Sequence, residues 1–206
     1  MKHSGVGRDE AEIEFSRIVA FSDGVFAIAI TLLVLALEIP DNVDDVGQAL
    51  RDQHDDVVAY AISFAVVGKF WISHHRFYAA LSRFDNTLMG MNLFYLAWIA
   101  LVPASSELLG NYSDSADSAI IYAANMAGAS LTFTTQVIYA SRRGLMRPDA
   151  PEEQRRLAGP ATFLIGAIFL LSIPLALIDP TLAQLSWLAI LVVGRSLVGW
   201  AARFVR

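Results

Sequence analysis

Two charged residues stand near the start of an otherwise apolar segment, RIVAFSDGVFAIAITLLVLALEIP, and could do chemistry there. Arg17 and Asp23 lie six residues apart. An unpaired charge in the hydrocarbon of a bilayer costs several kcal/mol, so Asp23 should face a partner or water rather than lipid. Arg17, Lys69 or a histidine of another helix could be that partner. Two interpretations stay open: a structural ion pair that locks helices together, or direct contact with permeating ions.

Four residues further along the same segment repeat with helical spacing. Ile28, Thr31, Leu32 and Leu35 stand at i, i+3, i+4 and i+7, so they share one face of a helix. Spacing alone favours a stripe that packs in a bundle or faces lipid. The alternative is a symmetric pore, in which the isoleucine and leucines form apolar rings and Thr31 a ring of hydroxyls. Apolar constrictions gate some channels by dewetting.

An aromatic and histidine cluster, GKFWISHHRF, ends the second apolar segment. Trp71 shares a helix face with His74 and with His75, three and four residues away. The two histidines are adjacent, so their side chains diverge by about 100° and one helix cannot chelate a metal with both. A hydrogen-bonding role beneath the first helix is expected. Alternatively, Asp23 and one of the histidines could exchange protons in a proton-coupled transporter.

The third apolar segment carries one buried amide, Asn92, in MNLFYLAWIALVP. Such an amide is expected to hydrogen-bond another helix, and Pro103 to bend or end its own helix. Elsewhere the sequence holds no Gly-rich nucleotide loop, no GxSxG, no HExxH and no TVGYG filter. It also holds no cysteine, which excludes disulfides and thiolate sites. No enzyme activity, cofactor, resident metal or nucleic-acid partner is therefore expected.

These residues must be positioned by membrane helices. The 206 residues are 55% hydrophobic and only 17% charged, against about 25% charged in globular proteins. A hydrocarbon core needs about 20 apolar residues per helix. Six segments qualify, after a polar segment over residues 1–16 that lacks the features of a secretory signal. They are Ile18–Ile39, Val57–Ser73, Leu88–Leu109, Ala116–Ala140, Ala158–Ile178 and Leu182–Ala202.

Charge separates the connections into two kinds. The loop from Asp41 to Asp56 holds six aspartates and one arginine, and the next loop on that side holds Asp114 and Asp117 without a cation. The turn between the last two segments holds Asp179 and no cation, whereas the remaining connections are rich in arginine, with Arg143 among five in one loop. The positive-inside rule then places both termini and the arginine-rich loops in the cytoplasm. Alternation of the two kinds requires an even number of spans, which supports an all-α, six-helix membrane domain over residues 17–206.

The string FSDGVFAIAITLL closely resembles the first-helix motif of the transmembrane protein 175 family, potassium channels of endosomes and lysosomes with smaller prokaryotic homologues. Arg17 stands four residues before Phe21, as in the family's RxxxFSDG. WISHHRF and MNLFYLAWIALVP resemble its second-helix and third-helix motifs, although Ala104 stands where phenylalanine is expected. The resemblance is specific over Arg17–Pro103.

The resemblance implies one six-helix repeat in a homotetramer, in the plasma membrane of a prokaryote, whose first helix lines the pore. It implies a K⁺-permeable, weakly selective channel for monovalent cations, and it reverses the preference for a packing stripe. By position, the constriction falls on Ile28, the hydroxyl on Thr31 and further apolar layers on Leu32 and Leu35. The residues that would hold this helix are Arg17, Ser22, Asp23, Trp71, His74 and Asn92.

Overall fold

The structure, a computed structural model, describes residues 6–37, 47–48, 51, 53–188 and 190, with backbone alone for residues 6–12 and 152–158. This part of the chain is helical apart from turns and one isolated β-bridge. Its elements are α1 (Val6–Leu32), the 3-10 helix η1 (Leu33–Ala36), α3 (His54–Ala79), α4 (Asn86–Ala100), α5 (Val102–Asn111), α6 (Ala116–Arg142), α7 (Glu152–Ala176) and α8 (Pro180–Trp187).

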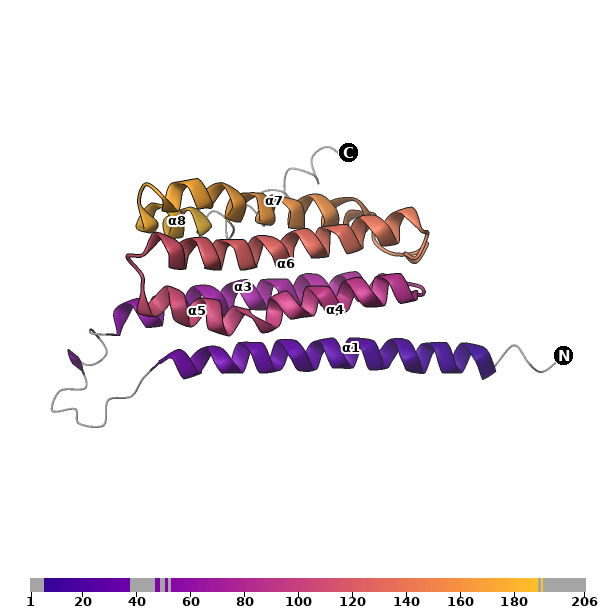
Figure 1. The fold of residues 1–206 in the computed structure, drawn as a ribbon. Coiled ribbons are helices and arrows are strands. Elements are labelled where there is room, and N and C mark those ends of the chain that lie inside the picture. Colours follow the sequence, from indigo (N-terminus) through magenta and orange to yellow (C-terminus); the bar gives the residue numbers. More distant parts are fainter. Residues whose placement is uncertain (1–5, 38–46, 49–50, 52, 189, 191–206) are drawn as a thin grey trace.

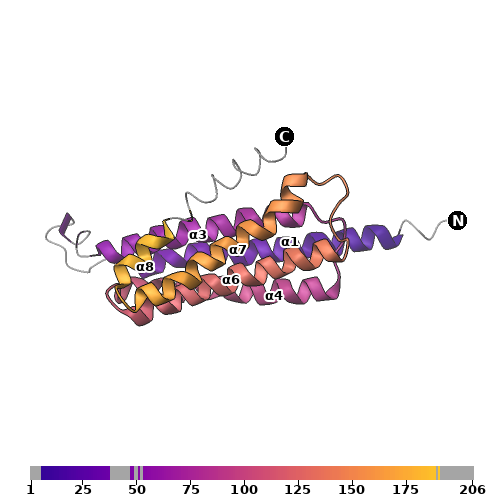
Figure 2. The same ribbon diagram turned by 90° about the horizontal axis from the view of Figure 1, so that it is seen from above.

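The helices lie side by side along one axis (Figures 1 and 2). In Figure 1, α1 forms one edge, α3 and the α4–α5 pair come next, then α6, and α7 with α8 form the opposite edge. Successive spans run in alternate directions, so residues 80–85 and 143–151 meet at one end, called here the arginine end. The connections at 112–115 and 177–179 lie at the other, acidic end.

Among the residues that the structure describes, four helices are long and apolar enough to cross a membrane. They span Ile13–Ala36, His54–Ala79, Asn86–Asn111 and Gly159–Ala176, which correspond to the first, second, third and fifth predicted segments. The second helix continues beyond the predicted Ser73 to Ala79. The sixth predicted span, Leu182–Ala202, falls largely outside the described residues, which cover only its start in α8. The part of the chain that the structure describes is an all-α membrane protein, as predicted, and four of its helices are apolar enough to span.

The fourth predicted span is helical as α6, but it is not apolar enough to cross by composition alone. The reason is its central position between α4, α5 and α7, where polar side chains find partners. Asn125 Nδ2 donates to Ser105 Oγ at 2.9 Å, and the hydroxyls of Thr134 and Thr162 lie 2.9 Å apart. Gln136 Oε1 accepts from a tyrosine of α3 at 3.2 Å. Helices that meet neighbours on most sides can carry such residues, since hydrogen bonds replace water.

Helix boundaries follow local chemistry. Asp85 caps α4, because its Oδ1 accepts from the backbone N–H of Leu88 at 2.9 Å. The α4–α5 break at Leu101 comes just before Pro103, whose missing N–H ends a regular helix. The predicted polar segment over residues 1–16 is helical from Val6 onward.

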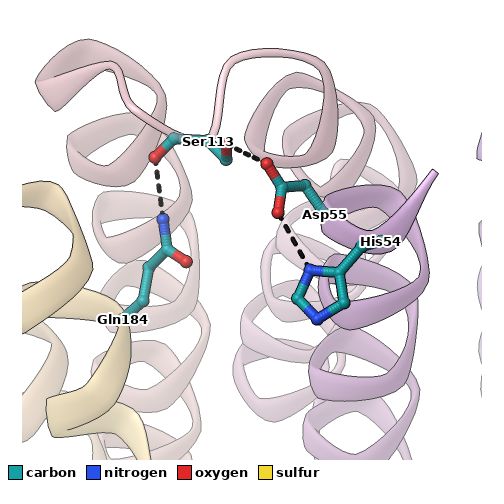
Figure 3. A network of polar contacts seen from close by, with 4 residues as sticks. All are labelled: His54, Asp55, Ser113 and Gln184. Carbon is teal, nitrogen blue, oxygen red and sulfur yellow. Dashed lines mark hydrogen bonds and ion pairs between the residues drawn. The ribbon is translucent and has the colours of Figure 1, made fainter. Parts of the chain in front are cut away.

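A hydrogen-bonded tie joins three elements at the acidic end (Figure 3). Ser113, in the α5–α6 turn, donates its hydroxyl to Asp55 of α3, while its carbonyl accepts from Gln184 of α8 at 2.9 Å. His54 Nδ1 lies 3.2 Å from the other carboxylate oxygen of Asp55. The start of α3 is thus joined to the α5–α6 turn, and through that turn to α8.

Candidate pore helix and its anchors

One face of α1 packs in the bundle. Ser22, Phe26, Ala29 and Leu33 are all at most 2% exposed, and their spacing of four, three and four residues makes one continuous stripe. The stripe meets α3, α4 and α5. It fixes the rotation of α1 about its own axis, so the exposed residues on the opposite side of the helix point away from the protomer.

The predicted pore residues Ile28, Thr31 and Leu32 occupy the exposed face of α1, and Leu35 lies in the 3-10 helix η1 that continues it. Ile28 is 61% exposed, Leu32 42% and Leu35 72%, and Thr31 is exposed beside them. Packing within one protomer therefore does not account for this stripe, which is left to lipid or to other copies of the chain. The Thr31 hydroxyl lies 2.9 Å from the carbonyl oxygens of both Ala27 and Ile28. Because its proton is engaged by the backbone, the hydroxyl oxygen keeps lone pairs for an outside partner.

A buried chain of hydrogen bonds anchors α1 to two other helices. Asn92 Nδ2, from α4, donates to Ser22 Oγ at 2.9 Å, and Ser22 in turn donates to the carbonyl of Ile18 at 2.9 Å. Asn92 Oδ1 lies 3.0 Å from His74 Nε2 of α3. Ser22, Asn92 and His74 are at most 1% exposed. The chain therefore ties α1, α4 and α3 together inside the bundle.

Aromatic rings hold His74 in place within this chain. Its imidazole stacks on Tyr78 at 4.2 Å between ring centroids and lies nearly parallel to Tyr95 at 5.8 Å. Asn92 Oδ1 can only accept, so His74 Nε2 must carry the proton that it donates. The two tyrosines were not among the residues singled out from the sequence. Their spacing offered a signal, since Tyr78 follows His74 by four residues and Tyr95 follows Asn92 by three.

A second anchor is more exposed and uses the next residue of α1. Trp71 Nε1, from α3, donates to Asp23 Oδ1 at 2.9 Å, and the indole in turn lies against His75 with 5.6 Å between centroids. No ion pair joins Asp23 to Arg17 or Lys69 in the described part of the structure. Arg17 is exposed on α1. The carboxylate of Asp23 is therefore bound by the indole N–H of Trp71, whereas the sequence suggested Arg17, Lys69 or a histidine as its partner.

Ser22 and Asp23 stand adjacent, so both anchors hold α1 at one level, about 7.5 Å along the axis from Ile28. Within the described residues no group of three potential metal ligands is present. The arrangement is that of a helix fixed in rotation and presenting an apolar face that carries one hydroxyl. Such a face can line a path, and it contains no nucleophile or acid–base pair for a reaction.

Comparison with known proteins shows which family the chain resembles. Residues 17–103 match the family profile described as endosomal/lysosomal potassium channel TMEM175. A potassium channel of Streptomyces collinus is 38% identical over 147 residues, covering 67% of this chain and 71% of the relative. A potassium channel of Chamaesiphon minutus is 32% identical over 167 residues, covering 74% and 82%. The chain belongs to the TMEM175 family. The resemblance carried by FSDGVFAIAITLL is thereby confirmed, and so is the prediction of an ion-channel protein rather than an enzyme.

Solved TMEM175 structures share the fold. The crystal structure of a lysosomal potassium-selective channel TMEM175 homolog from Chamaesiphon minutus superposes with a TM-score of 0.77 at 26% identity, covering 89% of this chain and 97% of that one. A variant of the potassium channel MtTMEM175, solved in complex with a nanobody fusion protein, superposes with a TM-score of 0.65 at 20% identity. A TMEM175 protein of Gallus gallus, described as an endosomal/lysosomal proton channel, is 31% identical over 115 residues, which is 50% of this chain and 23% of that protein.

Proposed function

We propose that this TMEM175 protein is a K⁺-permeable, weakly selective channel for monovalent cations, assembled as a homotetramer in a prokaryotic plasma membrane. The observation that carries the proposal is the exposed face of α1. A helix locked by two anchors presents Ile28, Leu32 and Leu35 outward, where the described residues of the protomer leave them exposed. Four copies related by symmetry would turn this face toward a common axis and line a pore with it.

Ile28 is proposed as the narrowest ring of that pore. Isoleucine methyl groups cannot replace the water that a K⁺ ion sheds, so a narrow apolar ring is a barrier when dry and conducts when wide enough for hydrated ions. Leu32 and Leu35 add apolar layers toward the acidic end. Thr31 is proposed as the nearest polar ring, because its hydroxyl oxygen keeps free lone pairs.

The orientation proposed for the channel follows the charges of the loops. Both termini and the arginine end lie in the cytoplasm, and the acidic end faces outside. The acidic loop, of which Asp41, Asp44, Asp45 and Asp52 lie outside the described residues, would raise the local concentration of cations at the outer mouth. Screening limits this effect to within about 8 Å at physiological salt.

Proton movement is the second candidate function, because animal members of the family are described as proton channels. Protons could pass through the same pore. A proton-coupled transporter that uses Asp23 with His74 or His75 is a separate alternative. Single-channel currents support the channel, whereas saturable flux with fixed stoichiometry supports the transporter.

The deciding experiment reconstitutes the purified protein in liposomes and measures reversal potentials in opposed K⁺ and Na⁺ gradients. We expect a reversal potential displaced toward the K⁺ equilibrium potential without reaching it, and native mass spectra of four copies of the 22.5-kDa chain. Liposomes without ionic current, or a monomer that conducts, would contradict the proposal.

A further inference from the structure

Two connections at the arginine end are joined by a short clasp. The backbone N–H of Ser82 donates to the carbonyl of Leu145 at 2.9 Å, and that of Arg147 donates to the carbonyl of Ala80 at 2.8 Å. Leu81 and Met146 form an antiparallel bridge between these bonds. The clasp brings the α3–α4 turn against the α6–α7 loop, although about 60 residues separate them in sequence.

The clasp gathers exposed arginines. Arg83 stands one residue after it, Arg142 and Arg143 stand just before it at the end of α6, and Arg76 lies in the last turn of α3. All four are exposed and are called here the arginine rim. None of the four forms an ion pair with a carboxylate among the described residues.

Acids near the rim are already engaged. Asp149 holds Arg147 of the same loop in a two-pronged pair, at 3.0 and 3.2 Å. Both carboxylate oxygens of Asp85 accept other bonds, from the N–H of Leu88 at 2.9 Å and from the hydroxyl of Tyr139 at 2.8 Å. Residues 152–156 add two acids and two arginines, so they do not change the net positive charge near the arginine rim.

Exposed isoleucines accompany two of these arginines. Ile72 precedes Arg76 by four residues and is 40% exposed, and Ile138 precedes Arg142 by four residues and is 43% exposed. Residues four apart lie above one another on a helix face. Each pair therefore presents a cation at the helix end and an apolar side chain one turn deeper. A phospholipid matches this pair, since its phosphate can contact the arginine and its acyl chain the isoleucine. A soluble anion would contact only the arginine.

We propose that the arginine rim binds anionic phospholipids, with the lipid phosphates against the guanidinium groups and the acyl chains against the isoleucines one turn deeper. Guanidinium groups pair with phosphate oxygens in a two-pronged geometry. Basic clusters directly beyond membrane helices attract anionic headgroups in this way. The site is separate from the proposed pore, which uses α1.

Native mass spectrometry of the full chain in detergent tests the proposal, with phosphatidylglycerol and phosphatidylcholine of identical acyl chains as probes. We expect the wild-type protein to retain phosphatidylglycerol at least about fivefold better. Arg83→Gln/Arg142→Gln/Arg143→Gln should lose most of this preference. The matched control, Arg147→Gln/Asp149→Asn, removes a cation and an acid from the same loop and should keep it.

Three outcomes would overturn the proposal: no headgroup preference in the wild type, an unchanged preference in the triple variant, or displacement of the lipid by glycerol phosphate at equal concentration. The last would indicate a site for soluble phosphate. A further measurement needs no variant and covers a triple variant that fails to fold. Raising the salt concentration about tenfold must weaken the wild-type preference, and a preference that salt leaves unchanged would refute the role of the arginines.

Discussion

At the scale of residues, α1 is held by a buried chain of hydrogen bonds through Ser22, Asn92 and His74. The amide nitrogen of Asn92 donates to Ser22 and its oxygen accepts from His74, while the Ser22 hydroxyl donates to a backbone carbonyl. A buried polar group without a partner costs more than a made bond contributes. The three residues therefore stabilise one rotation of α1 and destabilise the others.

Removal of the central amide should weaken this anchor. Asn92→Ala leaves the buried Nε2–H of His74 without an acceptor, which costs about 1–3 kcal/mol. A lower melting temperature of the detergent-solubilised protein is expected. Asn86→Ala, at the exposed first position of the same helix, is the matched control and should change little. Equal melting temperatures for the two variants would show that the chain of bonds does not anchor α1.

A change at Ile28 tests the proposed constriction. Ile28→Asn places an amide where methyl groups stood, so the ring should hydrate, raise the current and lower the preference for K⁺ over Na⁺. Leu171→Asn makes a similar change on α7, where the leucine is 68% exposed, and should leave both properties unchanged. Currents and reversal potentials in liposomes measure the effect. If only the α7 variant altered them, α1 would not line the path.

At the scale of elements, small residues let the helices approach closely. A side chain at Gly128 of α6 would place its Cβ 2.7 Å from the Trp98 ring of α4, and one at Gly166 of α7 would lie 3.0 Å from Ser130 of α6. Membrane helices have no hydrophobic drive toward one another, so close packing of this kind carries much of their association. The central position of α6 depends on these contacts.

The same substitution should have opposite effects at two glycines. Gly128→Ala forces the Trp98 ring aside and should destabilise the protein by about 1–3 kcal/mol. Gly90→Ala, on α4, meets nothing within 4 Å, and alanine favours a helix over glycine by about 1 kcal/mol, so that variant should be at least as stable as the wild type. The melting temperatures of the two variants, each compared with the wild type, measure the effect. A Gly128→Ala protein as stable as Gly90→Ala would exclude the packing argument.

The cap of α4 makes stability depend on pH. The Leu88 N–H, the Tyr139 hydroxyl and the nearby Arg143 charge lower the pKa of Asp85, although partial burial opposes them. A lowered folded-state pKa means that the stabilisation is complete above the unfolded value of about 4 and is lost as pH falls through the folded value. Asp85→Ala should cost about 1 kcal/mol at pH 7. The difference from wild type should shrink toward pH 3.

Asp85→Asn serves as the control for this pH dependence. An asparagine oxygen can still cap α4, but it does not titrate. Its melting temperature should therefore stay above that of Asp85→Ala at both pH values. A wild-type advantage over Asp85→Ala that persisted undiminished at pH 3 would show that the carboxylate is not the stabilising form.

At the scale of the whole molecule, the sequence predicted the helices better than their contacts. Hydropathy located the four helices that are apolar enough to cross a membrane, whereas the even number of spans remains a prediction from the alternation of loop charges. The polar face of α6 was harder to interpret, because the hydrogen bonds of Asn125 and Gln136 go to residues distant in the sequence. Charge alone did not predict the partner of Asp23, since it pointed to Arg17, Lys69 or a histidine. The family resemblance placed Trp71 in the same network, and the indole of Trp71 reaches Asp23.

Orientation in the membrane can be tested directly, because the chain has no native cysteine. Positions 114 and 143 lie just beyond the two ends of α6 and are suited to single cysteines. An impermeant thiol reagent added to intact cells should label Asp114→Cys and leave Arg143→Cys unlabelled until the cells are opened. The reverse pattern would invert the topology, and labelling of both from outside would break the six-span arrangement.

The buried chain through Asn92 also determines where protons cannot travel. A hydroxyl or an imidazole relays a proton by accepting one and releasing another, but the amide nitrogen of Asn92 only donates and its oxygen only accepts. Every bond in the chain is therefore polarised in a fixed direction, from α4 toward the Ile18 carbonyl and from α3 toward α4. Asn92 therefore couples α1 mechanically to His74, but it cannot relay a proton between them.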